Sequence, residues 1–215
     1  MGMPIKTDQR EYRRLDVANL ETRTEEDGGM IVEGYATTFN QPYKLLEGTD
    51  IRLMEQVDAG AFDSCDLSDV IMQYDHQGRV FARTRNGTLQ LMPDEHGLHI
   101  RADLGRTTLG RQLYEEIQGG YTDRMSFGFT VSAQEQRKAK DEDGKTVITR
   151  TIKGISKLYD VSAVSLPAND ATEISVRSLC DGVIAQAEEE CLAIARRKTK
   201  LRLMRLQMEV NGNDC

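Results

Sequence analysis

The sequence contains few of the residues that cross-link small folds or bind metal ions. It has no tryptophan, three histidines and four cysteines, and the cysteines show no Cys-x-x-Cys spacing. Neither a disulfide framework nor a structural zinc site is therefore indicated, and reduced thiols in a cytosol fit this pattern best. No segment has eighteen consecutive apolar residues, and the first thirty residues are rich in charge. We therefore expect no signal peptide, no membrane-spanning helix, no metal ion and no cofactor.

The chain also lacks the surplus positive charge of a nucleic-acid-binding protein. Its formal net charge is −7 over 215 residues, whereas such proteins neutralise phosphates with surplus Lys and Arg. The length suits one domain of ordinary size with an appendage, and it allows a substantial buried core. We expect a soluble intracellular protein that binds neither nucleic acid nor membranes.

What the sequence does have is a succession of short strand-like segments. Between residues 30 and 166 about seven segments have the composition and alternation of β-strands: MIVEGYATTF, IRLMEQV, DVIMQY, GTLQLM, GLHIRADL, RMSFGFTVSAQEQ and ISKLYDVSAVSL, with TVITRTIK as a further candidate. The segments PDEHG and KDEDGK are typical of turns, and the second predicts a solvated hairpin tip rather than a calcium loop.

One helix is expected among these strands. In TTLGRQLYEEIQGG, the side chains of Leu109, Leu113 and Ile117 share a helical face. Thr107 or Thr108 can cap the start, and the glycine pair ends the helix. A further helical turn or two is expected in DAGAFDSC. Many strands with few helices predict a mainly β (α+β) fold that forms a closed or nearly closed barrel.

The composition changes after Pro167. The segment PANDATEISVRS resembles a connector, and residues 179–210 are rich in Ala, Glu, Arg, Leu and Met. This composition predicts a long amphipathic helix that pairs with a partner, with a free-standing or disordered helix as the alternative. An acidic run at residues 188–190 and a basic run at residues 196–205 split its charge. The expected domains are therefore a barrel domain over residues 1–178 and a helical tail over residues 179–215.

The segment RMSFGFTVS places a serine in a hydrophobic strand. Alternation puts Met125, Phe127 and Phe129 on one face and Ser126 with Gly128 on the other. Glycine within a strand often marks the close approach of a ligand or another chain segment. A serine in this position is usually just exposed to water, but it could also be a nucleophile beside an open space.

A nucleophilic serine needs a base and a group that orients the base. The strand is expected to continue to His76, which shares one apolar face with Val70, Met72 and Tyr74. Burial there would keep the imidazole neutral, whereas Asp75 points to the other face. His96 lies in a turn and His99 is expected to face water. Asp160 interrupts an apolar strand, where a carboxylate is unfavourable unless it is paired. Taken together, Ser126, His76 and Asp160 agree with a catalytic site in a barrel wall, and the alternative is that each has an ordinary structural role.

Several segments resemble the prohead maturation proteases of tailed phages of the HK97 type: EGYATTF, GAF, YDHQGRVFARTRNGTLQL, DEHGL, MSFGF and LYDVSAVSLPANDAT. The resemblance covers about Tyr12 to Ser178. It implies that His76 and Ser126 are catalytic and that Asp160 is the third member. It also implies the fold of the herpesvirus capsid proteases, whose third member is a histidine. No histidine follows Ser126, so a second imidazole would have to come from upstream, and the third position stays open.

The resemblance implies a serine endopeptidase that is packaged in an immature phage capsid in the host bacterial cytoplasm. It would cut the scaffold segment of the major capsid protein and its own chain, and it could form a homo-oligomer. Backbone amides near Gly128, or Arg83, are the candidates for the oxyanion donors. The alternative function is a catalytically inactive scaffold or capsid-interaction protein on the same fold.

Overall fold

The computed structural model describes residues 10–15, 20–26 and 28–165. Within this part of the chain it contains eleven strands, one α-helix and one short 3₁₀ helix, η1 (Thr84–Asn86). The expectation of a mainly β fold with few helices is confirmed. The predicted tail helix of residues 179–215 lies outside the described residues.

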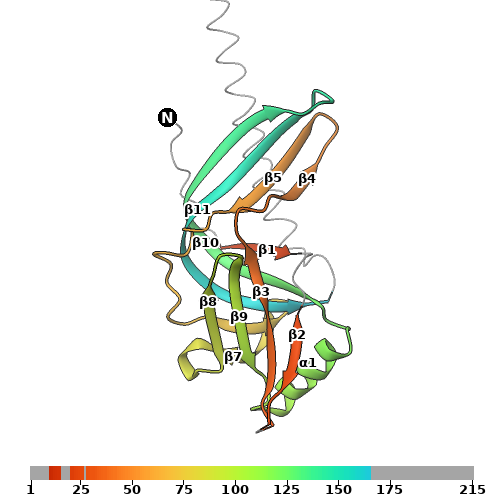
Figure 1. Cartoon of the computed structure of the whole chain (residues 1–215), viewed down its shortest axis with the longest axis vertical. Coiled ribbons are helices and arrows are strands. Elements are labelled where there is room, and N and C mark those ends of the chain that lie inside the picture. The colour runs from red at the N-terminus through yellow and green to blue at the C-terminus, as the bar shows by residue number, and fades with distance from the viewer. Residues whose placement is uncertain (1–9, 16–19, 27, 166–215) are drawn as a thin grey trace, which may run out of the picture. The chain divides into compact units, whose positions relative to one another are not determined.

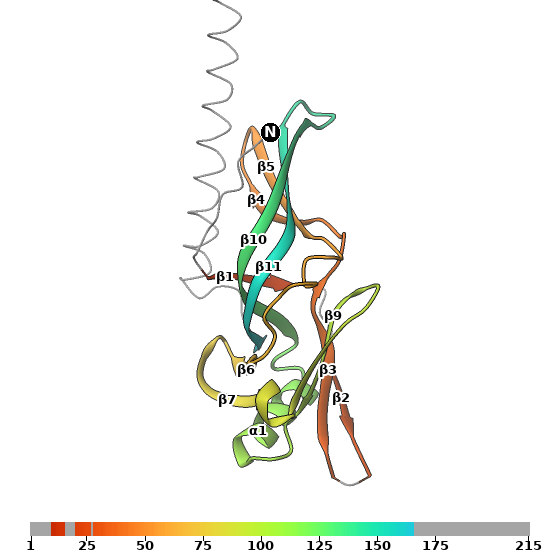
Figure 2. The same ribbon diagram turned by 90° about the vertical axis from the view of Figure 1, so that its left-hand side faces the viewer.

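The larger sheet has seven strands and is built around one long hairpin (Figure 1). Its hairpin strands β10 (Arg124–Lys140) and β11 (Thr146–Val164) are joined by the charged turn predicted from KDEDGK. The strand order is β1 (Glu11–Leu15), β10, β11, β5 (Ile51–Val57) and β4 (Tyr43–Glu47). β6 (Ile71–Tyr74) pairs with the far end of β11, and β7 (Gln77–Arg83) pairs with β6. Figure 2 shows β4 and β5 at one end of the hairpin, with β6 and β7 at the other.

The smaller sheet has four strands in the order β2 (Glu21–Thr24), β3 (Met30–Thr38), β9 (Gly97–Asp103) and β8 (Leu89–Pro93). Both sheets contribute to one hydrophobic core. Val32 and Ile100 enter this core from the smaller sheet, and Phe127, Phe129 and Val161 enter it from the larger one. The apolar face predicted for the RMSFGFTVS strand is therefore buried, as expected.

Helix α1 (Thr108–Gln118) begins after Thr107, whose side chain accepts a hydrogen bond from the Gly110 N–H. Its buried face includes Leu113 and Ile117, as predicted. Leu109, which shares this face by its spacing, is 38% exposed. The helix instead turns Gly110 inward, so close to the preceding chain that a Cβ there would lie 2.2 Å from the carbonyl oxygen of Leu104.

Two local predictions were wrong. The segment DAGAFDSC forms consecutive turns rather than helix, because its hydrogen bonds join residues three apart, as from the Ala61 N–H to the Asp58 carbonyl. Its apolar residues Ala61 and Phe62 are nevertheless buried. The strand predicted to continue to His76 ends at Tyr74, and His76 lies in the turn that follows.

In the described ranges, no helix is long and apolar enough to cross a membrane.

Candidate active site

Ser126 lies on β10 between two neighbouring strands. It is paired with Arg14 of β1 on one side and with Ser162 of β11 on the other. Its face of the sheet was expected to be open, but the side chain is only 2% exposed. Its Oγ lies 2.5 Å from Nε2 of His76, and its hydroxyl also lies 2.9 Å from the carbonyl oxygen of Arg13.

His76 reaches Ser126 from the turn between β6 and β7. The turn has two residues, since Tyr74 pairs with Gln77, and both Asp75 (φ 46°) and His76 (φ 57°) have positive φ. Such turns match the twist of paired strands, but they strain residues other than glycine, and strain of this kind is common at functional sites. The Asp75 N–H donates to the carbonyl oxygen of Ala163 at 3.1 Å, which fixes the turn to β11.

Asp160 lies on β11 and is completely buried. Its Oδ1 contacts Nδ1 of His76, and its Oδ2 pairs with the guanidinium of Arg10. The expectation that a carboxylate in this strand needs partners agrees with these contacts. Gly128, directly across from Asp160, leaves the space that the carboxylate occupies, because a Cβ there would lie 2.5 Å from Oδ2.

Ser162 is a fourth polar residue of the site, and the sequence reasoning missed it. Its hydroxyl donates to Oδ1 of Asp160 at 2.9 Å, and its Oγ lies 3.1 Å from Nδ1 of His76. The side chain is fully buried. The signal was available in the sequence, because Asp160 and Ser162 are two residues apart on one strand and so share a face.

Burial, and secondly the charge of Arg10, lower the pKa of His76 to about 4. The Asp160 carboxylate at Nδ1 favours the protonated ring, but Arg10 neutralises much of that effect. His76 is therefore neutral at pH 7 and can accept a proton at Nε2. A hydroxyl, an imidazole and a carboxylate in one hydrogen-bonded line are the parts required for acyl transfer through a serine nucleophile.

The other candidate residues lie elsewhere. The rings of His96 and His99 pack around Tyr35 of β3, with centroid distances of 4.6 and 5.1 Å. His96 is exposed in its turn, and His99 is half-buried. Asp160, rather than a second imidazole, faces Nδ1 of His76.

The two candidate oxyanion donors have other partners. The guanidinium of Arg83 donates to both carboxylate oxygens of Asp69, each at 2.6 Å. Gly128 is paired on both sides, with Tyr12 of β1 and with Asp160 of β11.

The described part of the chain contains no group of three or more His, Cys, Asp or Glu side chains placed to hold a metal ion.

The line of Ser126, His76 and Asp160 contains the three side chains of a serine hydrolase site, in the order nucleophile, base and acid. A family model described as "Caudovirus prohead serine protease" matches residues 18–182. The chain belongs to this family and is a serine peptidase, which confirms the resemblance found in the sequence.

Comparison with curated proteins gives no match. Among solved structures, the chain is similar to the capsid assembly protease gp21 of bacteriophage T4, at 12% sequence identity and a TM-score of 0.41. The alignment covers 73% of this chain and 99% of that one.

Proposed function

We propose that this prohead serine protease cuts the scaffold segment of the major capsid protein and its own chain, inside the immature capsid in the host bacterial cytoplasm. The observation that carries the catalytic assignment is the hydrogen-bonded line from Ser126 through His76 to Asp160. Capsid protein as the substrate follows from the family membership.

In the proposed mechanism, Oγ of Ser126 attacks the carbonyl carbon of the scissile bond, and Nε2 of His76 takes the hydroxyl proton. Asp160 stabilises the imidazolium at Nδ1, and Ser162 holds the carboxylate in place. The C–N bond then breaks as His76 returns the proton to the leaving amine. A water molecule, deprotonated by the same imidazole, hydrolyses the acyl-enzyme and restores Ser126.

We assign residues 1–178 to the protease domain and residues 179–215 to a segment that pairs with scaffold or with a second copy of the chain. The two sheets, which share one core, would correspond to the barrel of the herpesvirus capsid proteases. Neither nucleic acid nor a membrane is a partner in this proposal.

Co-expression with the cognate capsid protein, followed by intact mass measurement, tests the function. Wild-type chains should yield shortened capsid protein and shortened protease, whereas Ser126→Ala should leave both at full length. Ser132→Ala is a matched control, because it removes an exposed hydroxyl from the same strand and should process normally. Unchanged processing by Ser126→Ala would contradict the catalytic assignment. If neither the wild-type chain nor any variant processes the capsid protein, the result favours the alternative function, a catalytically inactive scaffold protein.

A further inference from the structure

The site is closed to a polypeptide substrate. Ser126 is 2% exposed and Asp160 is fully buried, and the His76 side chain is 8% exposed. Attack requires Oγ to come within about 3–3.5 Å of a substrate carbonyl carbon. Some part of the protein must therefore move away from Ser126 before a peptide can bind.

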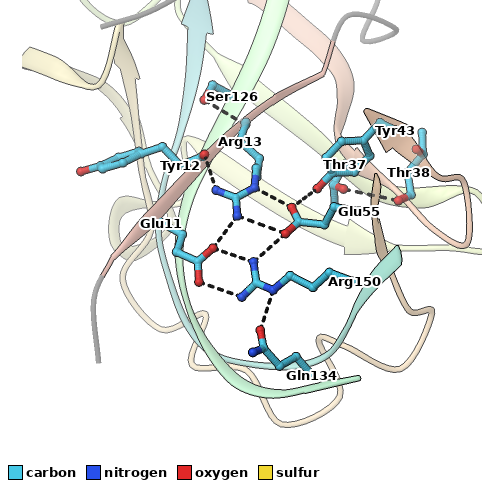
Figure 3. A network of polar contacts seen from close by, with 10 residues as sticks. All are labelled: Glu11, Tyr12, Arg13, Thr37, Thr38, Tyr43, Glu55, Ser126, Gln134 and Arg150. Atoms are coloured by element: carbon cyan, nitrogen blue, oxygen red, sulfur yellow. Dashed lines mark hydrogen bonds and ion pairs between the residues drawn. The ribbon is translucent and has the colours of Figure 1, made fainter. Parts of the chain in front are cut away.

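The N-terminal strand and the residue before it contact all three members of the site. The Arg13 carbonyl oxygen accepts from Ser126, the Tyr12 ring lies 4.5 Å from the His76 ring, and Arg10 pairs with Asp160. Figure 3 shows the bond from Ser126 to the backbone of β1. β1 runs antiparallel to β10 over Met125 to Phe129, so it occupies the strand position beside the nucleophile.

The contact with β1 opposes catalysis because a serine hydroxyl carries a single hydrogen. While that hydrogen is donated to the Arg13 carbonyl, it is not donated to Nε2 of His76, the atom that must accept it when Oγ attacks. The nearest peptide bond of β1 also turns its oxygen, not its carbon, toward Oγ.

We propose that β1 is an intramolecular inhibitor, which holds the strand position beside Ser126 until a polypeptide substrate replaces it. This inference rests on the proposed role of Ser126 as nucleophile. It names the occupant of the substrate position in the closed protein, and it makes release of β1 a required step before cleavage.

A buried ionic network fixes β1 in place (Figure 3). Arg13 binds Glu11 at 2.5 Å within β1 and Glu55 of β5 at 2.5 Å, while Arg150 of β11 binds Glu11 at 2.8 Å and Glu55 at 2.6 Å. All four residues are almost completely buried. Slipping β1 along β10 would separate these charges, so the network selects the register that puts the Arg13 carbonyl at Ser126.

When β1 leaves, no charge of this network is left buried without a partner. From the network, β1 takes away one acid, Glu11, and one base, Arg13. Glu55 keeps Arg150 at 2.6 Å and the Tyr43 hydroxyl at 2.6 Å, and Arg150 keeps Gln134 at 2.5 Å. Removing one partner of a buried pair is strongly destabilising, whereas removing a neutral pair avoids that penalty. The family model starts its match at residue 18, so β1 lies outside the part of the chain that this model covers.

The first test compares two double variants of the full-length chain. Glu11→Gln with Arg13→Gln removes the two charges that β1 contributes to the buried network and leaves the catalytic side chains intact. Glu135→Gln with Arg137→Gln makes the same two changes at the same spacing on the exposed part of β10. The probe is a biotin-linked fluorophosphonate. Serine Oγ bonds to its phosphorus, fluoride leaves, and the hydroxyl proton passes to the histidine.

Because labelling scales with the fraction of molecules in which β1 is released, the β1 variant should react at least about tenfold faster than wild type. The control variant should stay within about twofold. Equal labelling rates in the folded β1 variant and in wild type would overturn the inference while leaving the proposed function standing. If no variant is labelled, or if labelling persists after Ser126→Ala, the proposed function itself fails.

The second test uses the unmodified chain and so does not depend on how the β1 variant folds. A phosphonate on Ser126 cannot share space with the Arg13 carbonyl at 2.9 Å. Labelling should therefore increase hydrogen exchange in residues 11–15, but not in residues 146–152, which pair with β5. The Ser126→Ala chain treated with the same probe should show no change. Unchanged exchange in residues 11–15 after complete labelling would contradict the release of β1.

Discussion

Ser162→Ala isolates the part of the site that the sequence reasoning did not identify. The Ser162 hydroxyl donates to Oδ1 of Asp160, the oxygen that also contacts His76. A hydrogen bond to a charged group contributes about 1.5–3 kcal/mol, and about 1.4 kcal/mol of barrier corresponds to a tenfold change in rate. If that contribution is needed to hold the carboxylate against the imidazolium, kcat should fall roughly 10- to 100-fold while KM changes little.

The assay measures kcat and KM on a fluorogenic peptide, together with the pH profile of kcat/KM and the thermal midpoint. Ser156→Ala is the matched control, because Ser156 lies on the same strand and donates to the Thr130 carbonyl at 3.1 Å, away from Asp160. Ser162→Thr keeps a hydroxyl and should recover much of the rate. A carboxylate that has lost a donor should favour the imidazolium more, so the acid limb of the Ser162→Ala profile should move to higher pH.

A purely structural role would give a different pattern. Ser162→Ala would then lower the thermal midpoint about as much as Ser156→Ala, with kcat and the acid limb unchanged. That result would refute the assignment of Ser162 as a positioning residue for Asp160.

Three further changes test other parts of the argument. Asp160→Asn should keep the fold, shown by circular dichroism, but lower kcat by about 10⁴-fold, because the amide favours the wrong imidazole tautomer; a loss below tenfold would contradict its role. Glu55→Gln breaks a buried ionic network, so urea unfolding should show a loss of about 3–5 kcal/mol. The folded His76 has a pKa of about 4, below its ordinary value of 6.5. The unfolded chain therefore binds a proton first as pH falls, and between these values the free energy of unfolding should drop by up to about 3 kcal/mol. In His76→Gln this component of the pH dependence should be missing.

The strands that were predicted correctly have one apolar face. On β10, Met125, Phe127 and Phe129 alternate with smaller residues, so a period of two reveals the strand. β1 was missed because its sequence EYRRL has charges on both faces. Glu11 and Arg13 are buried only because Glu55 and Arg150 meet them there. Those partners are distant in the sequence, and local periodicity carries no information about them.

The three proposed catalytic residues were selected from the sequence, but part of their geometry was not. Ser126 and Asp160 were recognisable as polar residues within apolar strands. His76 was expected on a strand face because the alternation of the strand was continued past Tyr74, yet Asp75 and His76 both adopt positive φ in a two-residue turn. The burial of Ser126 was not predicted either, because it depends on β1, whose pairing with β10 was not apparent.

The ionic character of the β1 anchor suits a strand that must be both well placed and removable. An apolar strand at this position would pack against β10 in more than one register and would lose hydrophobic stabilisation on release. Buried ion pairs behave differently, because desolvation offsets much of their attraction while a misplaced charge is strongly penalised. The network of Glu11, Arg13, Glu55 and Arg150 therefore specifies where β1 lies and adds a modest stabilisation, in keeping with the roughly tenfold faster labelling expected when the two β1 charges are removed. That combination favours a closed site that opens when a substrate strand supplies new pairing along β10.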